Sequence, residues 1–385
     1  MKNYNIAIIV AAVLLGGTAI GFFTTGFATA GVVTYDQNFS YEPISPDPIE
    51  DLTINTDIGS IFIQYNSSAM SHYADIDVNL KITGLFMAGK NYTYFYHPSS
   101  EWWDEATKTF TLEALPEAWF DPTHWFSSYN INITVTLRTD VVYDLYAHTA
   151  TGAVEMKVPQ NVVLNRTILS SSTGALYMEA NNVTFNGKVS MTASTGSVNM
   201  KVNEVAFNDR VAMGSSTGSS SIFAVGVDFA EGYYVETSTG SLTLNFTNCI
   251  AGDDIEGYVS TGSITYKSYN MEYSKDINII LETSTGSINA NVYQYINMNA
   301  NVSSHMETST GSISFLYKDN IADIGVRFIS STSTGSINYV SDPTMEILGS
   351  VYESYNYATT ANQKYTFTLN TSTGSVSVDA ESTQP

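Results

Sequence analysis

The 385-residue chain has one cysteine, Cys249, and few basic residues. A single cysteine excludes an intrachain disulfide, so packing rather than cross-linking must hold the fold together. We interpret Cys249 as a small core residue, with a reactive or intermolecular thiol as the alternative. Lysine and arginine total 15 against 37 acidic residues, for a net charge of −22. This balance excludes nucleic-acid binding, which needs cations to neutralise phosphates, and disfavours adsorption to anionic lipid.

Charged residues make up only 14% of the chain, and the body lacks apolar residues at helical spacing. Serine, threonine, asparagine and tyrosine are abundant instead, and the 43% hydrophobic content is enough to bury a large core. A polar chain with few charges and no amphipathic helices is typical of an extracellular β protein. The composition therefore predicts an all-β fold.

The tetrapeptide Ser-Thr-Gly-Ser, or a close variant, recurs along the chain from residue 150 onward. Its glycines lie 22 residues apart at first, and then 24, 25, 24 and 39 residues apart. These glycines are Gly152, Gly174, Gly196, Gly218, Gly240, Gly262, Gly286, Gly311, Gly335 and Gly374. A regular period of this length indicates stacked structural units. We predict that each glycine forms a corner with positive φ, where the flanking hydroxyls bond nearby backbone groups.

Each unit carries two short segments in which apolar and polar residues alternate. One follows the glycine, as at Val198 and Met200, and the other precedes the next glycine, as at Val211 and Met213. Alternation of period two is typical of a strand with one buried face. Two strands per unit suit a parallel β-solenoid or a flat antiparallel meander. Because a meander needs a second layer and a coil covers itself, we predict a parallel β-helix-like solenoid of about 22–25 residues per coil.

The N-terminal stretch from Ile6 to Val33 contains no charged residue and is long enough to span a bilayer core of about 30 Å. Lys2 precedes it and acidic residues follow it, which predicts that the body of the chain is exported. Ala28-Thr29-Ala30 also matches a signal-peptide cleavage site. Residues 1–33 are therefore predicted to be a transmembrane anchor, or a signal peptide if they are cleaved. We therefore predict that the protein lies in the cell membrane with its body outside, or that it is secreted if the segment is cleaved.

Composition divides the exported part into four further regions. They are a proline-containing spacer at 34–50, an N-terminal β region at 51–148, the repeat solenoid at 149–380 and a tail at 381–385. An insertion at 84–130 holds all four tryptophans, which are Trp102, Trp103, Trp119 and Trp125. We interpret the insertion as a cap, because an uncovered first coil would leave a pairing edge. A sugar-binding platform of exposed rings is the alternative.

The far end of the rod is predicted to be the coil of Gly374, because Ser375–Ala380 is the last strand-like segment. Glu381–Pro385 is too short to cover an edge. The 39-residue repeat before Gly374 is therefore predicted to supply the cap, with Ser350–Asn362 as the covering segment.

Three acidic residues occupy equivalent positions in successive units, thirteen residues after a corner glycine. They are Asp209, Glu231 and Asp253. In stacked coils they would lie about 5 Å apart, a spacing that suits a shared cation such as calcium or the carboxylates of a retaining glycosidase. The same positions carry ordinary turn residues, so solvated turns are the main interpretation. We predict no catalytic site and no cofactor, and His97 and His124 are too loosely spaced for zinc.

Several segments together resemble one family of surface proteins. They are Asp57–Ile61, Ile133–Asp140, Val154–Pro159 and the Ser-Thr-Gly-Ser corners. Over about residues 50 to 380 the chain resembles the bacterial and archaeal β-strand-repeat proteins called putative adhesins. The resemblance implies a β-helical body on the cell surface. The tryptophan-rich insertion and the 39-residue repeat depart from the family pattern.

The predicted function is that of a non-catalytic structural or adhesive protein of the cell surface. Its expected partners are the membrane, through the N-terminal segment, and surface glycans or other surface proteins. One alternative is an extracellular carbohydrate-binding or carbohydrate-active β-helix protein, and another is a binder of an ordered surface through ladders of hydroxyls. Glycosylation of an exported chain would use the Asn-x-Ser/Thr sequons at Asn38, Asn66, Asn91, Asn132, Asn165, Asn182, Asn245, Asn301 and Asn370.

Overall fold

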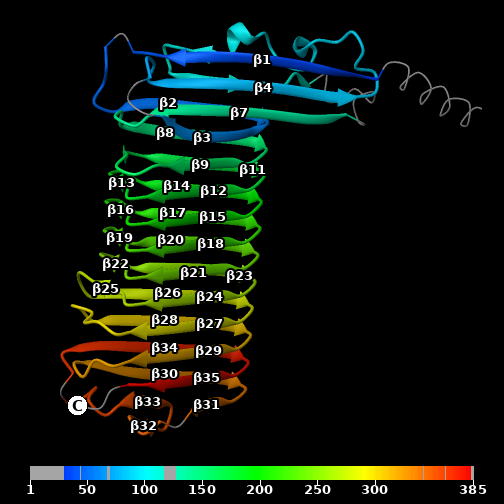
Figure 1. The fold of residues 1–385 in the computed structure, drawn as a ribbon. Helices are drawn as coiled ribbons and strands as arrows, with labels where there is room; N and C mark the ends of the chain where they lie inside the picture. The colour runs from blue at the N-terminus through cyan, green and yellow to red at the C-terminus, as the bar shows by residue number, and fades with distance from the viewer. Residues whose placement is uncertain are drawn as a thin grey trace, which may run out of the picture.

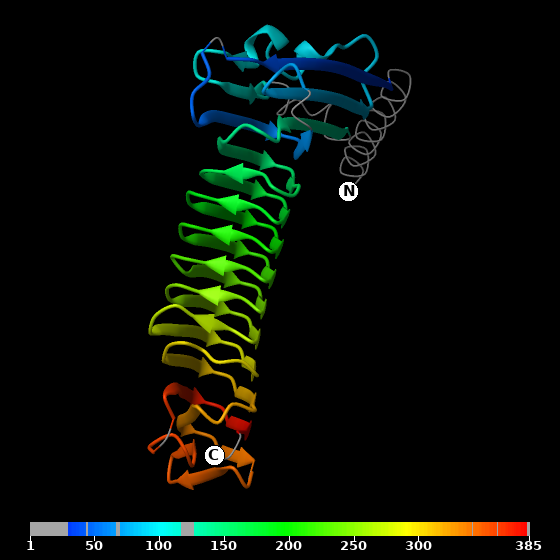
Figure 2. The same cartoon turned by 60° about the vertical axis from the view of Figure 1, so that its left-hand side comes forward.

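The computed structural model describes residues 30–43, 45–66, 70–116, 127–340, 342–359 and 361–382. They form a long rod of stacked coils with a broader N-terminal end (Figures 1 and 2). Within these ranges, no helix has the length and apolar character needed to cross a membrane. Most of the predicted anchor, residues 1–29, lies outside the described residues.

Two long sheets, A and B, form the opposite walls of the rod. Sheet A has the order β1 (Gly31–Tyr41), β4 (Ala74–Gly84), β7 (Ser128–Arg138), β3 (Ser60–Asn66), β9 (Val154–Val158), β12 (Leu176–Asn181), β15 (Val198–Asn203), β18 (Ser220–Val225), β21 (Leu242–Thr247), β24 (Ile264–Tyr269), β27 (Ile288–Gln294), β29 (Ile313–Asp319), β35 (Val376–Glu381) and β31 (Ile337–Val340). From β7 to β31, every pair of neighbours in this sheet is parallel.

Sheet B has the order β32 (Met345–Leu348), β33 (Val351–Ser354), β30 (Ile324–Thr334), β34 (Gln363–Thr373), β28 (Val302–Thr310), β26 (Ile277–Thr285), β23 (Ile255–Thr261), β20 (Tyr233–Thr239), β17 (Val211–Thr217), β14 (Val189–Thr195), β11 (Thr167–Thr173), β8 (Tyr143–Thr151), β2 (Glu50–Ile58), β6 (Thr109–Leu112) and β5 (Trp103–Asp104). The predicted all-β fold and its long parallel sheets are confirmed, and the antiparallel meander is wrong for the repeat region.

The structure adds a third strand per coil that the sequence did not predict. A short parallel sheet runs along the second corner of six coils and contains β10 (Val163–Leu164), β13 (Thr184–Phe185), β16 (Ala206–Phe207), β19 (Asp228–Phe229), β22 (Ile250–Ala251) and β25 (Glu272–Tyr273). Three of its buried side chains are phenylalanines that stack on one another. The rings of Phe185 and Phe207 lie 5.1 Å apart, and those of Phe207 and Phe229 lie 5.4 Å apart, nearly parallel in both pairs.

The corner glycines have the positive φ that the sequence predicted, for example 139° at Gly240 and 142° at Gly262. Each corner also presses on the corner of the neighbouring coil. A Cβ atom at Gly240 would lie 2.1 Å from the carbonyl oxygen of Gly218, which is far inside van der Waals contact. Glycine is therefore required here both by the backbone conformation and by the stacking.

An inward hydroxyl three residues before most of these glycines bonds the neighbouring corner. Ser171 Oγ donates to Gly152 O at 3.0 Å, and Thr283 Oγ1 donates to Gly262 O at 2.9 Å. Such bonds satisfy carbonyl groups that would otherwise be buried without a partner. The predicted bonding by the flanking hydroxyls is confirmed at the residue after the glycine: Ser219 Oγ accepts a hydrogen bond from Ser241 N at 3.2 Å, and Ser263 Oγ accepts one from Ser287 N at 3.3 Å.

Cys249 lies in the core with no exposed surface, and it is not part of a disulfide. Burial raises the pKa of its thiol, which keeps the group protonated and unreactive. The interpretation of Cys249 as a core residue is confirmed.

At the N-terminal end, strand β1 changes the predicted boundaries of the anchor (1–33) and of the spacer (34–50). Residues 31–41 form β1, an edge strand antiparallel to β4, so the anchor does not extend to Val33 and the first part of the 34–50 spacer is strand. The side chains of Val33 and Tyr41 are buried, because the alternate residues of β1 face the aromatic insertion and the first coil. The 84–130 insertion contains η1 (Tyr92–Tyr94), η2 (Ser99–Glu101), β5 and β6.

The C-terminal end also differs from the prediction. The last coil in the sequence, which carries Gly374, lies inside the rod, between the coils of Gly311 and Gly335. The terminal coil is that of Gly335, and the antiparallel hairpin β32–β33 covers it in sheet B. The hairpin includes part of the predicted covering segment 350–362, so that segment does cover an end, although it is the end of a different coil. In the predicted 381–385 tail, Glu381 belongs to β35.

All nine sequon asparagines lie at the surface or are half-buried. Asn132, which lies within β7, is half-buried because it alternates with the buried Ile131 and Ile133 and thus faces outward. Strand location therefore does not remove any of the nine from solvent.

An ion pair ties the N-terminal cap to the first coil and predicts a dependence of stability on pH. The buried Glu50 carboxylate accepts hydrogen bonds from Lys108 Nζ and Tyr41 Oη, each at 2.7 Å, and from Asp47 N at 2.9 Å. Burial opposes the charge, but these bonds outweigh it and hold the pKa of Glu50 below its ordinary 4.5.

Because the folded pKa is the lower one, this contribution to stability is present above pH 4.5 and is lost as the pH falls through the folded pKa. We expect the melting temperature of the wild type to fall between about pH 6 and pH 3 by more than that of Glu50→Gln. Thermal melts of both proteins across this range measure the difference. Parallel curves would contradict the assignment.

Candidate functional site

The tryptophans that the structure describes do not form an exposed platform. Trp102 is 1% exposed, its Nε1 donates to His97 O at 2.8 Å, and its ring packs edge-on against Tyr35 and Tyr92. Trp103 is half-buried against Tyr41. Trp119, Trp125 and His124 lie outside the described residues. For Trp102 the sugar-platform alternative is wrong, because its buried ring packs within the N-terminal cap.

The three predicted acidic residues lie on the second corner of their coils, where two of them bond the next residue of their own turn. Asp209 Oδ1 accepts a hydrogen bond from the backbone N of Arg210, and Asp253 Oδ1 accepts one from that of Asp254. Asp253 also pairs with Lys275 at 3.3 Å, and Glu231 lies at the surface. Among the described residues, no group of three His, Cys, Asp or Glu is placed to hold a metal ion.

We expect millimolar calcium to leave the melting temperature unchanged. The reason is that the two aspartates already have partners in their own turns and in Lys275. The measurement compares the wild type with the variant Asp209→Asn, Glu231→Gln, Asp253→Asn, each with calcium and with EDTA. A calcium-dependent rise that occurs only in the wild type would contradict the solvated-turn interpretation.

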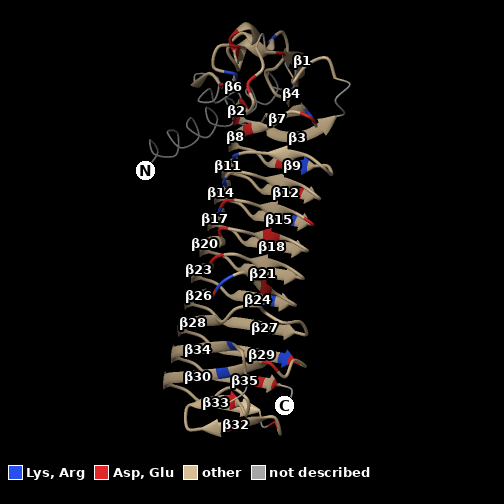
Figure 3. Ribbon diagram, turned by 90° about the vertical axis from the view of Figure 1, so that its left-hand side faces the viewer, with Lys and Arg blue, Asp and Glu red and all other residues tan. Residues whose placement is uncertain are grey.

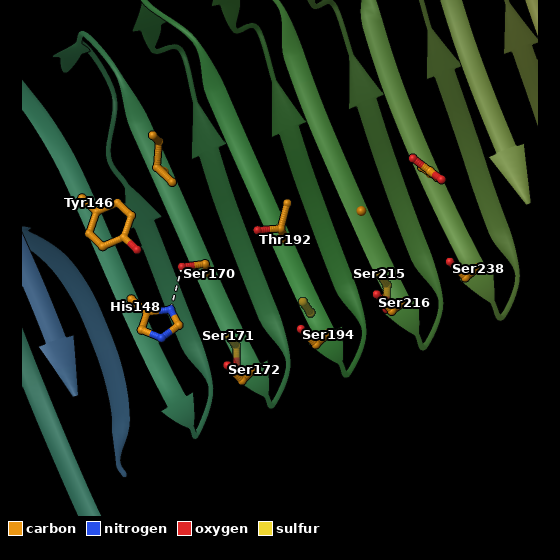
Figure 4. A pocket seen from close by; sticks show the side chains of 14 residues that line it. Tyr146, His148, Ser170, Ser171, Ser172, Thr192, Ser194, Ser215, Ser216 and Ser238 are labelled. Carbon is orange, nitrogen blue, oxygen red and sulfur yellow. Dashed lines mark hydrogen bonds between the residues drawn. The ribbon is translucent and has the colours of Figure 1, made fainter. Parts of the chain in front are cut away.

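The structure has a hollow elsewhere, on the outer face of sheet B. A groove of about 570 Å³ crosses β8, β11, β14, β17 and β20 (Figure 4). Its floor is the outward side chain four residues before each corner glycine. Hydrogen-bonded neighbours bring these residues side by side in the order His148, Ser170, Thr192, Gly214 and Glu236.

The groove exists because the outward side chains become small in the middle of this row. Gly214 has no side chain, and Ser170 and Thr192 are short, whereas Tyr146 stands at one end and is 37% exposed. His148 Nδ1 and Ser170 Oγ lie 2.9 Å apart, and Figure 4 shows this contact as a dashed line. A second row of hydroxyls, Ser172, Ser194, Ser216 and Ser238, borders the groove on the side of the corners.

Charged and aromatic groups lie beside Glu236 at the other end of the groove. Tyr234 Oη donates to Glu236 Oε2 at 2.8 Å, and burial together with this bond raises the pKa of Tyr234 to about 12. The guanidinium of Arg210 lies over the Tyr234 ring, and Arg210 pairs with Glu256 at 2.6 Å. Along the rod in Figure 3, charged residues are scattered rather than gathered into one patch.

A smaller hollow of about 220 Å³ continues the groove along the same row, beyond Glu236. Glu282 and Glu307 are register neighbours there, and His305 Nε2 lies 3.0 Å from Glu307 Oε2 and 3.9 Å from Glu282 Oε1. These groups are all partly exposed on the outer surface of a flat sheet. We therefore interpret these contacts as hydrogen bonds between solvated surface side chains.

The described residues that line the main groove do not provide the paired carboxylates of a glycosidase. Among the described residues that line it, Glu236 is the one carboxylate, and His148 lies four strands away, about 19 Å at ordinary strand spacing. A glycosidase pair needs carboxyl groups within about 10 Å of each other on either side of the bond. The groove instead offers hydroxyls, an imidazole and a tyrosine ring along a nearly flat floor.

Sequence reasoning missed this groove because it followed the residues that repeat. The floor positions hold histidine, serine, threonine, glycine and glutamate in turn, so they show no period. Aligning the units on their glycines and comparing side-chain size at the fourth position before each would have revealed the dip at Gly214.

Comparisons with known proteins do not identify a family. No family model matches the chain, and no curated protein matches it. A solved structure described as a "putative cell adhesion protein" from Clostridium sporogenes is similar at 10% identity, over 90% of this chain and 100% of that chain, with a TM-score of 0.17. An identity and a score this low carry no argument about the present chain.

Proposed function

We propose that the protein is a non-catalytic adhesive rod of the cell surface, and that it binds its target through the outer groove of sheet B. The observation that carries the proposal is this groove of about 570 Å³, which lies on the outer face of a body whose inner faces cover one another. The N-terminal segment before β1 would hold the rod at the membrane.

The lining of the groove favours a neutral saccharide of the cell surface as the ligand. Three floor side chains and four border side chains end in groups that can both donate and accept hydrogen bonds to sugar hydroxyls. The exposed ring of Tyr146 provides a flat apolar face at one end. The net charge of −22 disfavours acidic glycans, because it repels anionic ligands.

Gly214→Trp tests the proposal by filling the groove without disturbing the coil. A Cβ atom at Gly214 would meet only Glu236 O, at 3.4 Å, so the side chain fits on the outer face. We expect an array of neutral glycans to detect binding by the wild type, and Gly214→Trp to weaken it at least about tenfold, or about 1.4 kcal/mol, with an unchanged melting temperature.

The matched control is Thr243→Trp, which places the same side chain on the outer face of sheet A, on the opposite wall of the rod. It should bind like the wild type. Equal binding by Gly214→Trp and Thr243→Trp would remove the groove from the binding site. Hydrolysis of a bound glycan by the wild type would contradict the non-catalytic assignment.

A further inference from the structure

The C-terminal coil enters the rod out of sequence order. After β29 the chain continues to β30, yet β30 is not hydrogen-bonded to β28 and β31 is not hydrogen-bonded to β29. The C-terminal strands β34 and β35 fill both positions. Figure 1 shows these red strands between the coils that precede them in the sequence. Residues 320–323 therefore span two strand spacings, about 10 Å, where other connections span one.

This arrangement means that the rod contains a slot one coil wide, with an unpaired parallel edge on each side until the C-terminal segment enters. On one side, Gly311 N donates to Thr373 O and Ile313 N donates to Ser375 O, both at 2.9 Å. On the other side, Gly374 N donates to Thr334 O at 2.9 Å. Both edges are thus satisfied by a single inserted segment.

The side chains of the inserted segment also make specific contacts with the walls of the slot. The ring of Phe367 lies between Phe315, at 4.5 Å, and Phe328, at 5.1 Å, and stacks on the latter. Tyr365 Oη lies 2.9 Å from Tyr273 Oη in the core. Gln363 Oε1 accepts a hydrogen bond from Met298 N at 2.7 Å. The slot is therefore a specific acceptor for the segment 363–382.

The corner glycine fixes the register of the inserted segment. A Cβ atom at Gly374 would lie 1.9 Å from Gly311 O, and one at Gly335 would lie 1.7 Å from Gly374 O. Only a segment with glycine at this place can seat between the two corners. At its end, Ser382 Oγ donates to Asp319 Oδ2 at 2.9 Å, so the contacts continue beyond β35.

We propose that this slot also accepts the segment 363–382 of a second copy, so that two molecules exchange C-terminal coils. Residues 355–362 connect this segment to strand β33 of the hairpin. A second copy offers the same edges, rings and glycine corner. Exchange therefore conserves every contact of the slot and alters only the connection, which is the condition for domain swapping.

The test uses two full-length variants that each carry one added cysteine. Ser314 of β29 and Ser377 of β35 are register neighbours on the outer face of sheet A, where the first is exposed and the second half-buried. One protein carries Ser314→Cys and the other Ser377→Cys, with different tags. The two are unfolded together, refolded at high concentration and then oxidised.

Exchange places the two added cysteines on adjacent strands of different molecules, so we expect a covalent heterodimer. Mass spectrometry of the disulfide-linked peptides should assign the bond to positions 314 and 377. The matched control pair is Asn199→Cys with Ser221→Cys, register neighbours in the middle of the rod. Exchange at the C-terminal slot leaves that pair on separate molecules.

A third variant separates exchange from random oxidation. Ser377→Cys combined with Gly374→Val cannot seat its segment beside Gly311, so its yield of heterodimer should fall at least about fivefold. Its melting temperature is measured alongside, and Ser377→Cys combined with Ser375→Ala should keep the full yield. A heterodimer yield no greater than that of the mid-rod pair would overturn the proposal, as would an equal yield from the Gly374→Val protein.

Discussion

Gly240→Val is expected to destabilise the rod by several kcal/mol, whereas Ser241→Ala should change the free energy of unfolding by less than about 0.5 kcal/mol. Two effects act on Gly240. A β-branched side chain is strained at φ 139°, and its Cβ would lie 2.1 Å from the carbonyl oxygen of Gly218. Relieving that overlap would push these two coils apart and weaken the bond from Gly218 N to Thr239 O that joins them.

Ser241 provides the matched control because it lies next to Gly240 at the same corner and its side chain is exposed. Thermal melts followed by circular dichroism give the comparison. A solenoid can unfold in parts, so hydrogen exchange at the neighbouring coils should show where protection is lost. Equal melting temperatures for the two variants would refute the requirement for glycine at the corner.

The second large effect is expected at Phe207, where Phe207→Ala should cost about 3–5 kcal/mol. The ring is 1% exposed and stacks between Phe185 and Phe229. Removing it leaves a cavity in the middle of the column, and the neighbouring coils cannot close it because their own spacing is fixed by the strand ladders.

Phe223→Ala serves as the control, because Phe223 lies on the outer face of sheet A and is 46% exposed. We expect it to lower stability by less than about 1 kcal/mol. Urea denaturation of both variants gives the comparison. Similar losses from the two substitutions would mean that the aromatic column is not a main source of stability.

The sequence was sufficient to predict the stacked coils, because the same constraints act on every unit. Gly196 and Gly240 recur because each must avoid the corner beside it, and Val198 and Met200 alternate because every second residue of β15 faces the core. The third strand was missed because Ala206–Phe207 is too short for an alternating pattern.

The spatial order of the last coils could not be predicted from local pattern. The corners at Gly335 and Gly374 carry the same Ser-Thr-Gly-Ser motif, so either could stack on Gly311. The choice depends on long-range packing, such as the position of Phe367 between Phe315 and Phe328. The sugar-platform alternative failed at Trp102 for a similar reason, since its burial depends on Tyr35 and Tyr92.

The direction of the strand ladders gives the rod an unequal mechanical response. The hydrogen bonds between coils, such as Gly196 N to Thr217 O and Gly218 N to Thr239 O, point along the length of the rod. A pull from end to end therefore acts on these ladders in series, so that they open one after another, whereas a sideways push is shared by many coils. Each 22-residue coil that opens would release roughly 75 Å of chain. A rod pulled at both ends would therefore yield in steps and lengthen, dissipating force before the attachment at either end has to break.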